Sequence, residues 1–453
     1  MTAVGETTRK PSVLWAPDRR AATTGLLLLV TLAAFEQMGV STALPTLVHD
    51  LHGESLYSWP FTMFLATSVV GNVVGGRLCD RRGPALVLLI GPLLFALGLV
   101  VAGSAQEMTQ LLIGRALQGV GGGAQVVALY VLIALVFPER DRPVAFAALS
   151  AAWVIPSLIG PTIAGLVTQY LNWRWIFLGL APLVVIGWVL VTIVLRRLPA
   201  FRPAASGVPR RGLTLAAIGA AVGLAVLSWA GDNPSLVGLA VVVVALAVIV
   251  PALRVLLPKG TLTVRAGLPS VILARALLSG AFFGSQIFLP LVLQRVHGFS
   301  PALAGVPLTI AALGWSGASW WQGRHPDLAR PLLMRRGFLL ITLGLVVVTF
   351  VAPVWGPPWL AAVAWVFAGM GMGLAVSSVS VLVLKLSSDQ DRGFNSAALQ
   401  LSDLFGQSLF VGLGGVLVAQ LGPTLGWSPL NAVLAACTLF GALVLARRAA
   451  SNS

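Results

Sequence analysis

Charged residues are scarce in this chain of 453 residues. They make up 9% of the sequence, whereas 57% is hydrophobic and the mean hydropathy is +0.93. A soluble domain carries about 25% charged residues, so the composition excludes a large soluble protein and indicates an integral membrane protein. The 29 Lys and Arg exceed the 14 Asp and Glu. Because these cations stand in short clusters between apolar runs, they indicate positive-inside loops and not a nucleic-acid interface.

Residue types that form disulfides, metal sites and catalytic centres are also few. Cys79 and Cys437 lie within or at the edge of apolar runs and indicate neither a disulfide framework nor a metal site. His49 and His52 could bind a metal only weakly, and we predict none. The sequence has no G-x-x-x-x-G-K-[ST] motif, which argues against direct use of ATP. We expect no enzyme activity and no cofactor.

Apolar runs long enough to cross a bilayer dominate the chain instead. A spanning helix needs about 20 mainly apolar residues, and such segments must be helical because lipid cannot satisfy an open strand edge. We count fourteen in a 6+2+6 division, with predicted domains at 1–211, 212–258 and 259–453. The expected spans are 22–44, 57–79, 84–104, 108–136, 143–167, 174–195, 212–230, 235–257, 269–293, 300–321, 332–351, 357–384, 394–419 and 429–447.

The positions of the cations predict the orientation. With the N-terminus inside, all but four of the 29 Lys and Arg fall in cytoplasmic segments or at their edges. The opposite orientation inverts that ratio, so both termini are expected to be cytoplasmic. The basic segment 196–212 closes the first six spans. The four exceptions are Arg174 and Arg295, predicted outside, and Arg115 and Arg275, within spans.

A weak internal repeat supports two related halves. The loop after the second span reads GRLCDRRG (76–83), and the corresponding loop of the last six spans reads GRHPDLAR (323–330). Both place Gly four residues before Asp. Two six-helix halves with internal repeats are typical of transporters, whose substrate site lies between the halves near the bilayer midplane.

The first of these loops carries a family resemblance. The stretch GGRLCDRRGPAL (75–86) resembles the major facilitator superfamily pattern G-x-x-x-D-R-x-G, although Pro84 and Ala85 replace the trailing basic residues. The resemblance implies the major facilitator fold and a role for this loop in conformational change. The alternative is an ordinary positive turn. The matching residues are Gly76, Asp80, Arg81 and Gly83.

A second motif lies inside the fourth expected span. The run LLIGRALQGVGGG (111–123) places Arg115 in an apolar helix, with Gln118 almost one turn later on a similar face. It resembles the R-x-x-Q-G pattern of the superfamily's antiporters, in which the arginine is implicated in proton transfer; Arg115, Gln118 and Gly119 match. Alternatively, Arg115 only braces the bundle through neighbouring carbonyl groups.

A third motif indicates the direction of transport. The run WVIPSLIGPTIAG (153–165) resembles the G-P-x-x-G-G motif associated with exporters, with Ala164 in place of one glycine. Gly160, Pro161 and Gly165 match. Export is what this resemblance implies, and a plain proline-kinked packing helix is the alternative.

Two further matches point to the fourteen-helix drug:proton antiporters within the superfamily. NWRWIFLGLAP (172–182) resembles that branch's W-R-W-I-F-x-I-N-x-P. EQMGVSTALP places Glu36 nine residues before Pro45, where the branch carries Asp in D-x-T-x-V-N-V-A-L-P. The extra pair 212–257 also agrees with this branch.

Ionisable residues inside spans are functional candidates by default, because charge in a bilayer is costly. Desolvation penalises the charged form of a carboxyl, so Glu36 is our first candidate for proton exchange near neutral pH, with Arg115 as its modulator. Substrate and proton would compete for that charge or for a common conformational state; a static Glu36 bonded within the bundle is the alternative. Asp403 is either a second protonation or cation site or a structural partner of Arg275.

Neutral polar and aromatic residues within spans suggest a substrate cavity, although an aromatic stripe is more often packing. Our candidates for its lining are Gln118, Gln286, Gln400, Gln407 and Trp315.

These observations together predict a multi-pass protein of the inner (cytoplasmic) membrane. We expect a monomeric, proton-coupled antiporter that exports amphipathic or hydrophobic compounds by alternating access, as multidrug efflux pumps do, and so contributes to antibiotic resistance. The proton gradient is the expected energy source. One alternative is an exporter of an endogenous lipid, metabolite or amino acid, and another is a membrane receptor on the same scaffold.

Overall fold

The computed structural model of the chain is helical throughout the residues that it describes. The expected basic connection 196–212, with the domain boundary at 211, lies almost wholly outside those residues. The all-α class predicted from the sequence is confirmed. The described residues are 13–17, 19–196, 212–233, 235–325, 327–388 and 391–450.

The N-terminal bundle consists of four long helices followed by two interrupted ones. A turn at Ala152 and Trp153 separates α5 from α6, and Pro156 falls in the first turn of α6, where a missing N–H costs no intrahelical bond. The helices are α1 (Arg20–Asp50), α2 (Trp59–Arg82), α3 (Ala85–Gly103), α4 (Met108–Val136), α5 (Arg142–Ala151), α6 (Val154–Tyr170), α7 (Trp175–Leu178) and α8 (Leu180–Leu195), with short 3-10 turns η1 (Glu54–Leu56) and η2 (Glu139–Asp141).

A helix pair and the C-terminal bundle complete the chain. Helix α16 is interrupted at Gly422, whose φ of 79° and ψ of 169° are not helical, and Pro423 follows. The elements are the pair α9 (Leu213–Asp232) and α10 (Leu236–Leu256), then α11 (Leu268–Gln286), α12 (Leu289–Arg295), α13 (Pro301–Gly323), α14 (Arg330–Thr349), α15 (Leu360–Leu386), α16 (Arg392–Phe440), the π-helical segment η3 (Gly441–Leu445) and α17 (Ala446–Ala450).

Twelve helical segments of the described chain are long and apolar enough to cross a membrane. Two places separate this count from the fourteen predicted spans. The expected span 143–167 is divided into α5 and α6, neither of which qualifies alone. The continuous run Arg392–Ala450 counts once, although it holds the interruption at Gly422. A multi-pass membrane protein is therefore shown, and the number of spans stays a prediction.

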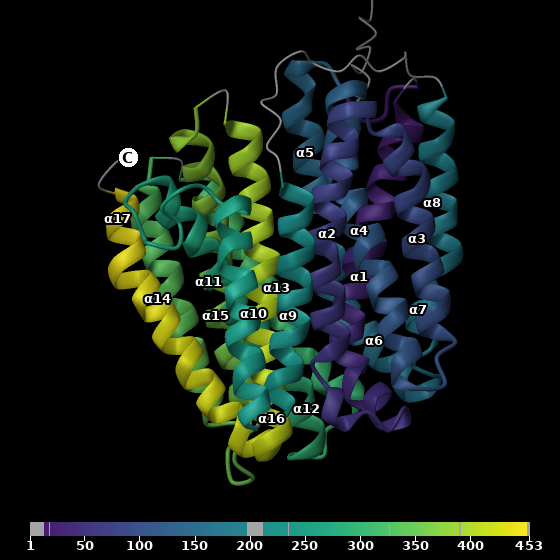
Figure 1. Cartoon of the computed structure of the whole chain (residues 1–453). Helices are drawn as coiled ribbons and strands as arrows, with labels where there is room; N and C mark the ends of the chain where they lie inside the picture. Colours follow the sequence, from purple (N-terminus) through teal and green to yellow (C-terminus); the bar gives the residue numbers. More distant parts are fainter. Residues whose placement is uncertain are drawn as a thin grey trace, which may run out of the picture.

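The pair α9 and α10 stands between the two bundles (Figure 1). Helix α9 contacts both α2 of the N-terminal bundle and α16 of the C-terminal bundle. Ala217 and Ala220 of α9 share one buried cluster with Val69 and Val73 of α2 and with Leu401 of α16. Small alanine side chains let the three helices approach closely. The pair thus connects the bundles along one side of their interface.

Helices α6 and α13 bring the bundles together elsewhere, through glycines. A Cβ added to Gly165 would lie 2.5 Å from Ala302 Cα, and one added to Gly305 would lie 2.8 Å from the Pro161 carbonyl oxygen. Real Cβ atoms do not approach other atoms so closely, so both positions require glycine. The two backbones are consequently in direct van der Waals contact across the interface.

A hydrogen bond also links the bundles near a break in the chain. The buried Tyr57 hydroxyl donates to the Ile287 carbonyl at 3.1 Å. Ile287 lies in the turn between α11 and α12, where the helix is interrupted before Pro290. The interruption frees a carbonyl, and a side chain of the opposite bundle satisfies it.

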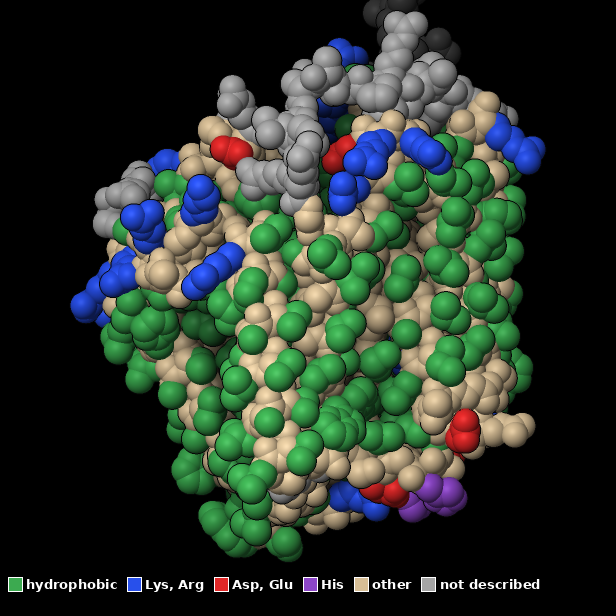
Figure 2. Space-filling model, viewed as in Figure 1, with side chains coloured by type: hydrophobic (Ala, Val, Ile, Leu, Met, Phe, Trp, Pro, Cys, Tyr) green, Lys and Arg blue, Asp and Glu red, His purple; other side chains and the backbone are tan. Residues whose placement is uncertain are grey.

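The molecular surface has a broad apolar band (Figure 2). Lys and Arg side chains gather at one end of the band, and the other end shows only a few charged and histidine side chains. A hydrophobic belt between two polar ends is the surface that a bilayer requires.

Candidate proton and substrate sites

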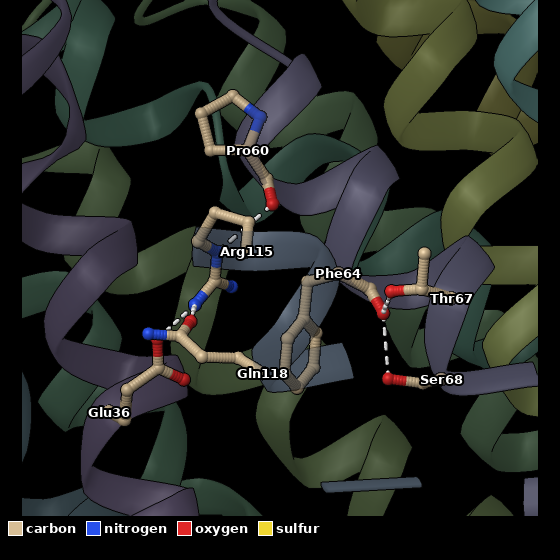
Figure 3. Close-up of polar contacts among 7 residues, drawn as sticks. All are labelled: Glu36, Pro60, Phe64, Thr67, Ser68, Arg115 and Gln118. Carbon is tan, nitrogen blue, oxygen red and sulfur yellow. Dashed lines mark hydrogen bonds and ion pairs between the residues drawn. The ribbon is translucent and has the colours of Figure 1, made fainter. Parts of the chain in front are cut away.

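Glu36 and Arg115 meet inside the N-terminal bundle. Glu36 lies midway along α1, Arg115 lies on α4, and both residues are 0% exposed. The Arg115 Nη1 atom donates to Oε1 of Glu36 and to Oε1 of Gln118, while its Nε donates to the Pro60 carbonyl oxygen at 3.0 Å (Figure 3). The structure therefore brings Glu36 together with Arg115 and Gln118, the two polar residues of the second motif.

Aromatic rings of α2 complete the surroundings of the guanidinium. Its Cζ atom lies 4.5 Å from the centroid of the Phe64 ring and 5.8 Å from that of Phe61. A ring face attracts a cation most strongly where water is excluded. Sequence reasoning missed these rings and the Pro60 carbonyl, although the spacing of Phe61 and Phe64, three residues apart on a helix, hinted at a common face.

The cluster leaves several buried polar atoms without a partner. Among the described residues, Oε2 of Glu36, Nη2 of Arg115 and Nε2 of Gln118 make no hydrogen bond. Unmet hydrogen-bonding capacity in an apolar interior costs free energy. The free Oε2 is an acceptor where a proton can bind. Protonation of Glu36 would leave the Arg115 charge uncompensated, so the cluster is sensitive to a single proton.

A second charged pair lies in the C-terminal bundle. The Nε of Arg275 donates to Oδ1 of Asp403 at 2.9 Å, and its Nη2 donates to Oδ2 at 3.2 Å. The two side chains are 17% and 22% exposed, so they are less enclosed than the first pair. Gln400, one turn before Asp403, lies against Tyr130 of α4. The structure thus has the pairing of Asp403 with Arg275 that the sequence left as one of two options.

A small cavity lies between the bundles. Its volume is about 10 Å³, room for about one water molecule. Two expected cavity residues, Gln286 and Gln407, line it, and sequence reasoning missed Gln37 and Ser41 on the opposite side. Gln118 bonds Arg115 instead, and Gln400 lies near the second charged pair.

Trp315 is placed in an aromatic cluster and not at this cavity. Its ring packs edge-on against Phe282 with a centroid distance of 5.9 Å, and Phe282 stacks on Trp365 at 6.0 Å. Such contacts stabilise the packing of α11, α13 and α15.

The loop motif after α2 is exposed at the end of the bundle. Gly83 ends α2 with a φ of 79°, a conformation that favours glycine. Asp80 and Arg81 are exposed, and the Asp80 carboxylate has no partner within the described residues. Close approach of α2 to α4 occurs at Gly75, where an added Cβ would lie 2.7 Å from the backbone of α4, whereas a Cβ at Gly76 would make only an ordinary contact at 3.7 Å.

The third motif positions α6 against two helices. Gly160 faces α1, where an added Cβ would lie 3.4 Å from that of Met38, an ordinary contact. Pro161 and Gly165 face α13 across the bundle interface. The motif therefore lies at a seam that must slide or open if the bundles move relative to each other.

Two bundles of membrane-spanning helices, with a buried ion pair in one bundle and a cavity between the two, form a multi-pass membrane protein. The sequence profile of the Major Facilitator Superfamily matches residues 26–334, and the chain belongs to this superfamily.

The chain is also similar in sequence or in fold to known transport proteins. An uncharacterised MFS-type transporter of Mycobacterium tuberculosis is 30% identical over 424 residues, which cover 89% of this chain; the chain spans 60% of that protein's length. The multidrug efflux pump SdrM of Staphylococcus aureus is 25% identical over 351 residues, covering 76% of this chain and 77% of SdrM. The crystal structure of the POT family transporter PepTSo shares the fold, with a TM-score of 0.72, 15% identity and coverage of 95% and 98%. These relatives are transporters and not enzymes.

Proposed function

We propose that the protein is a proton-coupled antiporter that exports amphipathic or hydrophobic compounds across the cytoplasmic membrane. The observation that carries the proposal is the fully buried pair of Glu36 and Arg115 beside the bundle interface. The similarity to SdrM, a multidrug efflux pump, supports the substrate class. Energy comes from the proton gradient, and the chain needs no cofactor.

The proposal includes fourteen spans in a 6+2+6 arrangement with both termini in the cytoplasm. Joining α5 to α6, α7 to α8 and α11 to α12, and dividing α16 at Gly422, gives this number. The gathering of Lys and Arg at one end of the apolar band supports that end as cytoplasmic (Figure 2).

Protonation of Glu36 is the event that couples the gradient to movement. With Glu36 ionised, Arg115 ties α1 to α4 and, through the Pro60 carbonyl, to α2. A protonated Glu36 no longer neutralises Arg115, and the buried cation must find new partners or be hydrated. The two protonation states therefore favour different packings of these helices, and a substrate that prefers one packing shifts proton affinity through linkage.

The third motif (153–165) supports export as the direction through its resemblance to the motif associated with exporters. It lies where α6 and α13 are in backbone contact, and movement of the bundles must change this seam. The loop residues Asp80 and Arg81 remain proposed elements of the conformational change.

The test uses inside-out membrane vesicles that are acidified by respiration, with a fluorescent dye that reports the internal pH. Adding chloramphenicol should dissipate the gradient when the wild-type protein is present. Glu36→Gln should abolish this response, and Glu36→Asp, which keeps a titratable carboxyl, should retain it. Glu107→Gln, which removes an exposed carboxylate at the start of α4, is the matched control and should behave as wild type. Full proton release by Glu36→Gln would refute Glu36 as the coupling residue.

A further inference from the structure

The cavity between the bundles is lined by uncharged polar groups from both of them. Gln37 and Ser41 belong to α1, Gln286 to α11 and Gln407 to α16. The remaining lining is apolar and includes the ring of Phe61. No described residue that lines the cavity carries a charge. A ligand held here would contact both bundles at once.

Three of these polar residues are buried, and the hydroxyl of one of them, Ser41, lacks a partner among the described residues. Ser41 is 2% exposed, Gln286 is 4% exposed and Gln407 is 5% exposed. Within the described chain, the Ser41 hydroxyl is buried without a hydrogen-bond partner, and the carboxamide residues Gln286 and Gln407 line the cavity beside it. Leaving such a group unpaired costs about 1–3 kcal/mol. A ligand that donates and accepts hydrogen bonds would remove this penalty.

The acidic residue nearest in sequence faces away from the cavity. Glu36 precedes Gln37 by one residue, which on a helix turns its side chain by about 100° toward α4 and Arg115. Phe61 stands between the two sites, since its ring lines the cavity and its centroid lies 5.8 Å from the Arg115 Cζ atom. The carboxylate is thus already paired and is screened from a ligand in the cavity.

We propose that this cavity is the substrate site and that it selects uncharged aromatic or alicyclic compounds bearing amide or hydroxyl groups. The proposal rests on the proposed transport function and names its substrate class. Substrate and proton do not compete for one charge. They act on each other through α1 and Phe61, which border both sites, and the cavity widens to admit the substrate when the bundles separate.

A permanent organic cation fits this site poorly. Its charge would lose hydration without gaining a carboxylate, because Glu36 is engaged by Arg115. The three carboxamides offer dipoles that suit an amide or a hydroxyl better than a full charge.

Binding to the purified full-length protein tests the proposal. The probes are chloramphenicol, an uncharged aromatic amide with hydroxyl groups, and tetraphenylphosphonium, a permanent cation of similar bulk. Gln286→Met and Gln407→Met remove hydrogen bonds at nearly constant volume, and each should weaken chloramphenicol binding about fivefold to tenfold. Gln125→Met is the matched control, since Gln125 is also a buried glutamine but lies on α4 away from the cavity. This variant should bind chloramphenicol with an affinity within about twofold of wild type.

The outcomes separate this proposal from the transport function. The proposal is overturned if the wild type fails to bind chloramphenicol, if the Gln286 and Gln407 variants bind it like wild type, or if tetraphenylphosphonium binds more tightly and loses affinity in Glu36→Gln. Glu36→Gln should still bind chloramphenicol, because Glu36 does not line the cavity, while losing proton release. If tetraphenylphosphonium drives proton release and chloramphenicol does not, the proposed antiport is retained and the proposed substrate class is refuted. Chloramphenicol binding without any proton release would preserve the site and refute antiport.

Discussion

Removing Arg115 while keeping Glu36 is the most informative test of stability. Arg115→Met deletes a fully buried guanidinium that bonds Glu36, Gln118 and the Pro60 carbonyl and lies on the Phe64 ring. Breaking a buried ion pair by removing one partner costs about 3–5 kcal/mol, because the other charge remains buried and unpaired. We expect a value near the upper end, since two neutral acceptors lose their donor as well.

The double variant isolates the charge itself. In Glu36→Gln/Arg115→Met no orphan charge remains, so the loss of unfolding free energy should fall to about 2 kcal/mol or less. Lowering the pH should also restore stability to Arg115→Met alone, because a protonated Glu36 no longer carries the unpaired charge.

Unfolding in mixed micelles, titrated with SDS and followed by tryptophan fluorescence, measures these differences. Arg140→Met is the control, since its side chain is 87% exposed and its loss should change stability by less than about 0.5 kcal/mol. The reasoning is refuted if Arg115→Met is as stable as wild type, or if the double variant is no more stable than the single one.

Two further predictions concern the bundle interface and the second charged pair. Gly165→Val should abolish transport in folded protein, because the added side chain would collide with Ala302. The control is Gly317→Val on α13, where a Cβ meets no atom within 4 Å, and this variant should transport normally. Transport by Gly165→Val would contradict the close packing of α6 and α13. If Asp403 only pairs with Arg275, then Asp403→Asn/Arg275→Gln should keep proton-driven transport within about threefold of wild type, since a partly exposed pair contributes about 1 kcal/mol to stability. Vesicle transport assays check the glycine variants and this double variant. Complete loss of proton coupling in the double variant would make Asp403 a protonation site.

The sequence predicts the buried charges well because a charge within an apolar run is visible without a structure. Glu36, Arg115 and Asp403 were found in this way, and the R-x-x-Q spacing placed Gln118 beside Arg115. Their partners were harder to find. The Phe64 ring and the Pro60 carbonyl are apolar or backbone groups on another helix, and only tertiary packing brings them to Arg115.

The helix interruptions differ in the same way: the local sequence indicates where a helix breaks but does not reveal the tertiary contacts at the break. Gly422, where α16 is interrupted, falls in the gap between the last two expected spans, and a glycine followed by proline is a strong local signal. The break after Gln286 was missed, although Pro290 in the first turn of α12 indicated it. At that break, the Tyr57 hydroxyl of the opposite bundle donates to the Ile287 carbonyl, a contact that no local pattern reveals.

Uptake of radiolabelled chloramphenicol into proteoliposomes with an acidic interior tests the central claim most directly. Protons leaving through the purified protein should drive the compound inward against its gradient, and collapse of the pH difference by an ionophore should stop this accumulation. Glu36→Asp should accumulate the compound and Glu36→Gln should only equilibrate it. Accumulation that is equal in wild type and Glu36→Gln, or that is insensitive to the imposed gradient, would contradict proton-coupled antiport through Glu36.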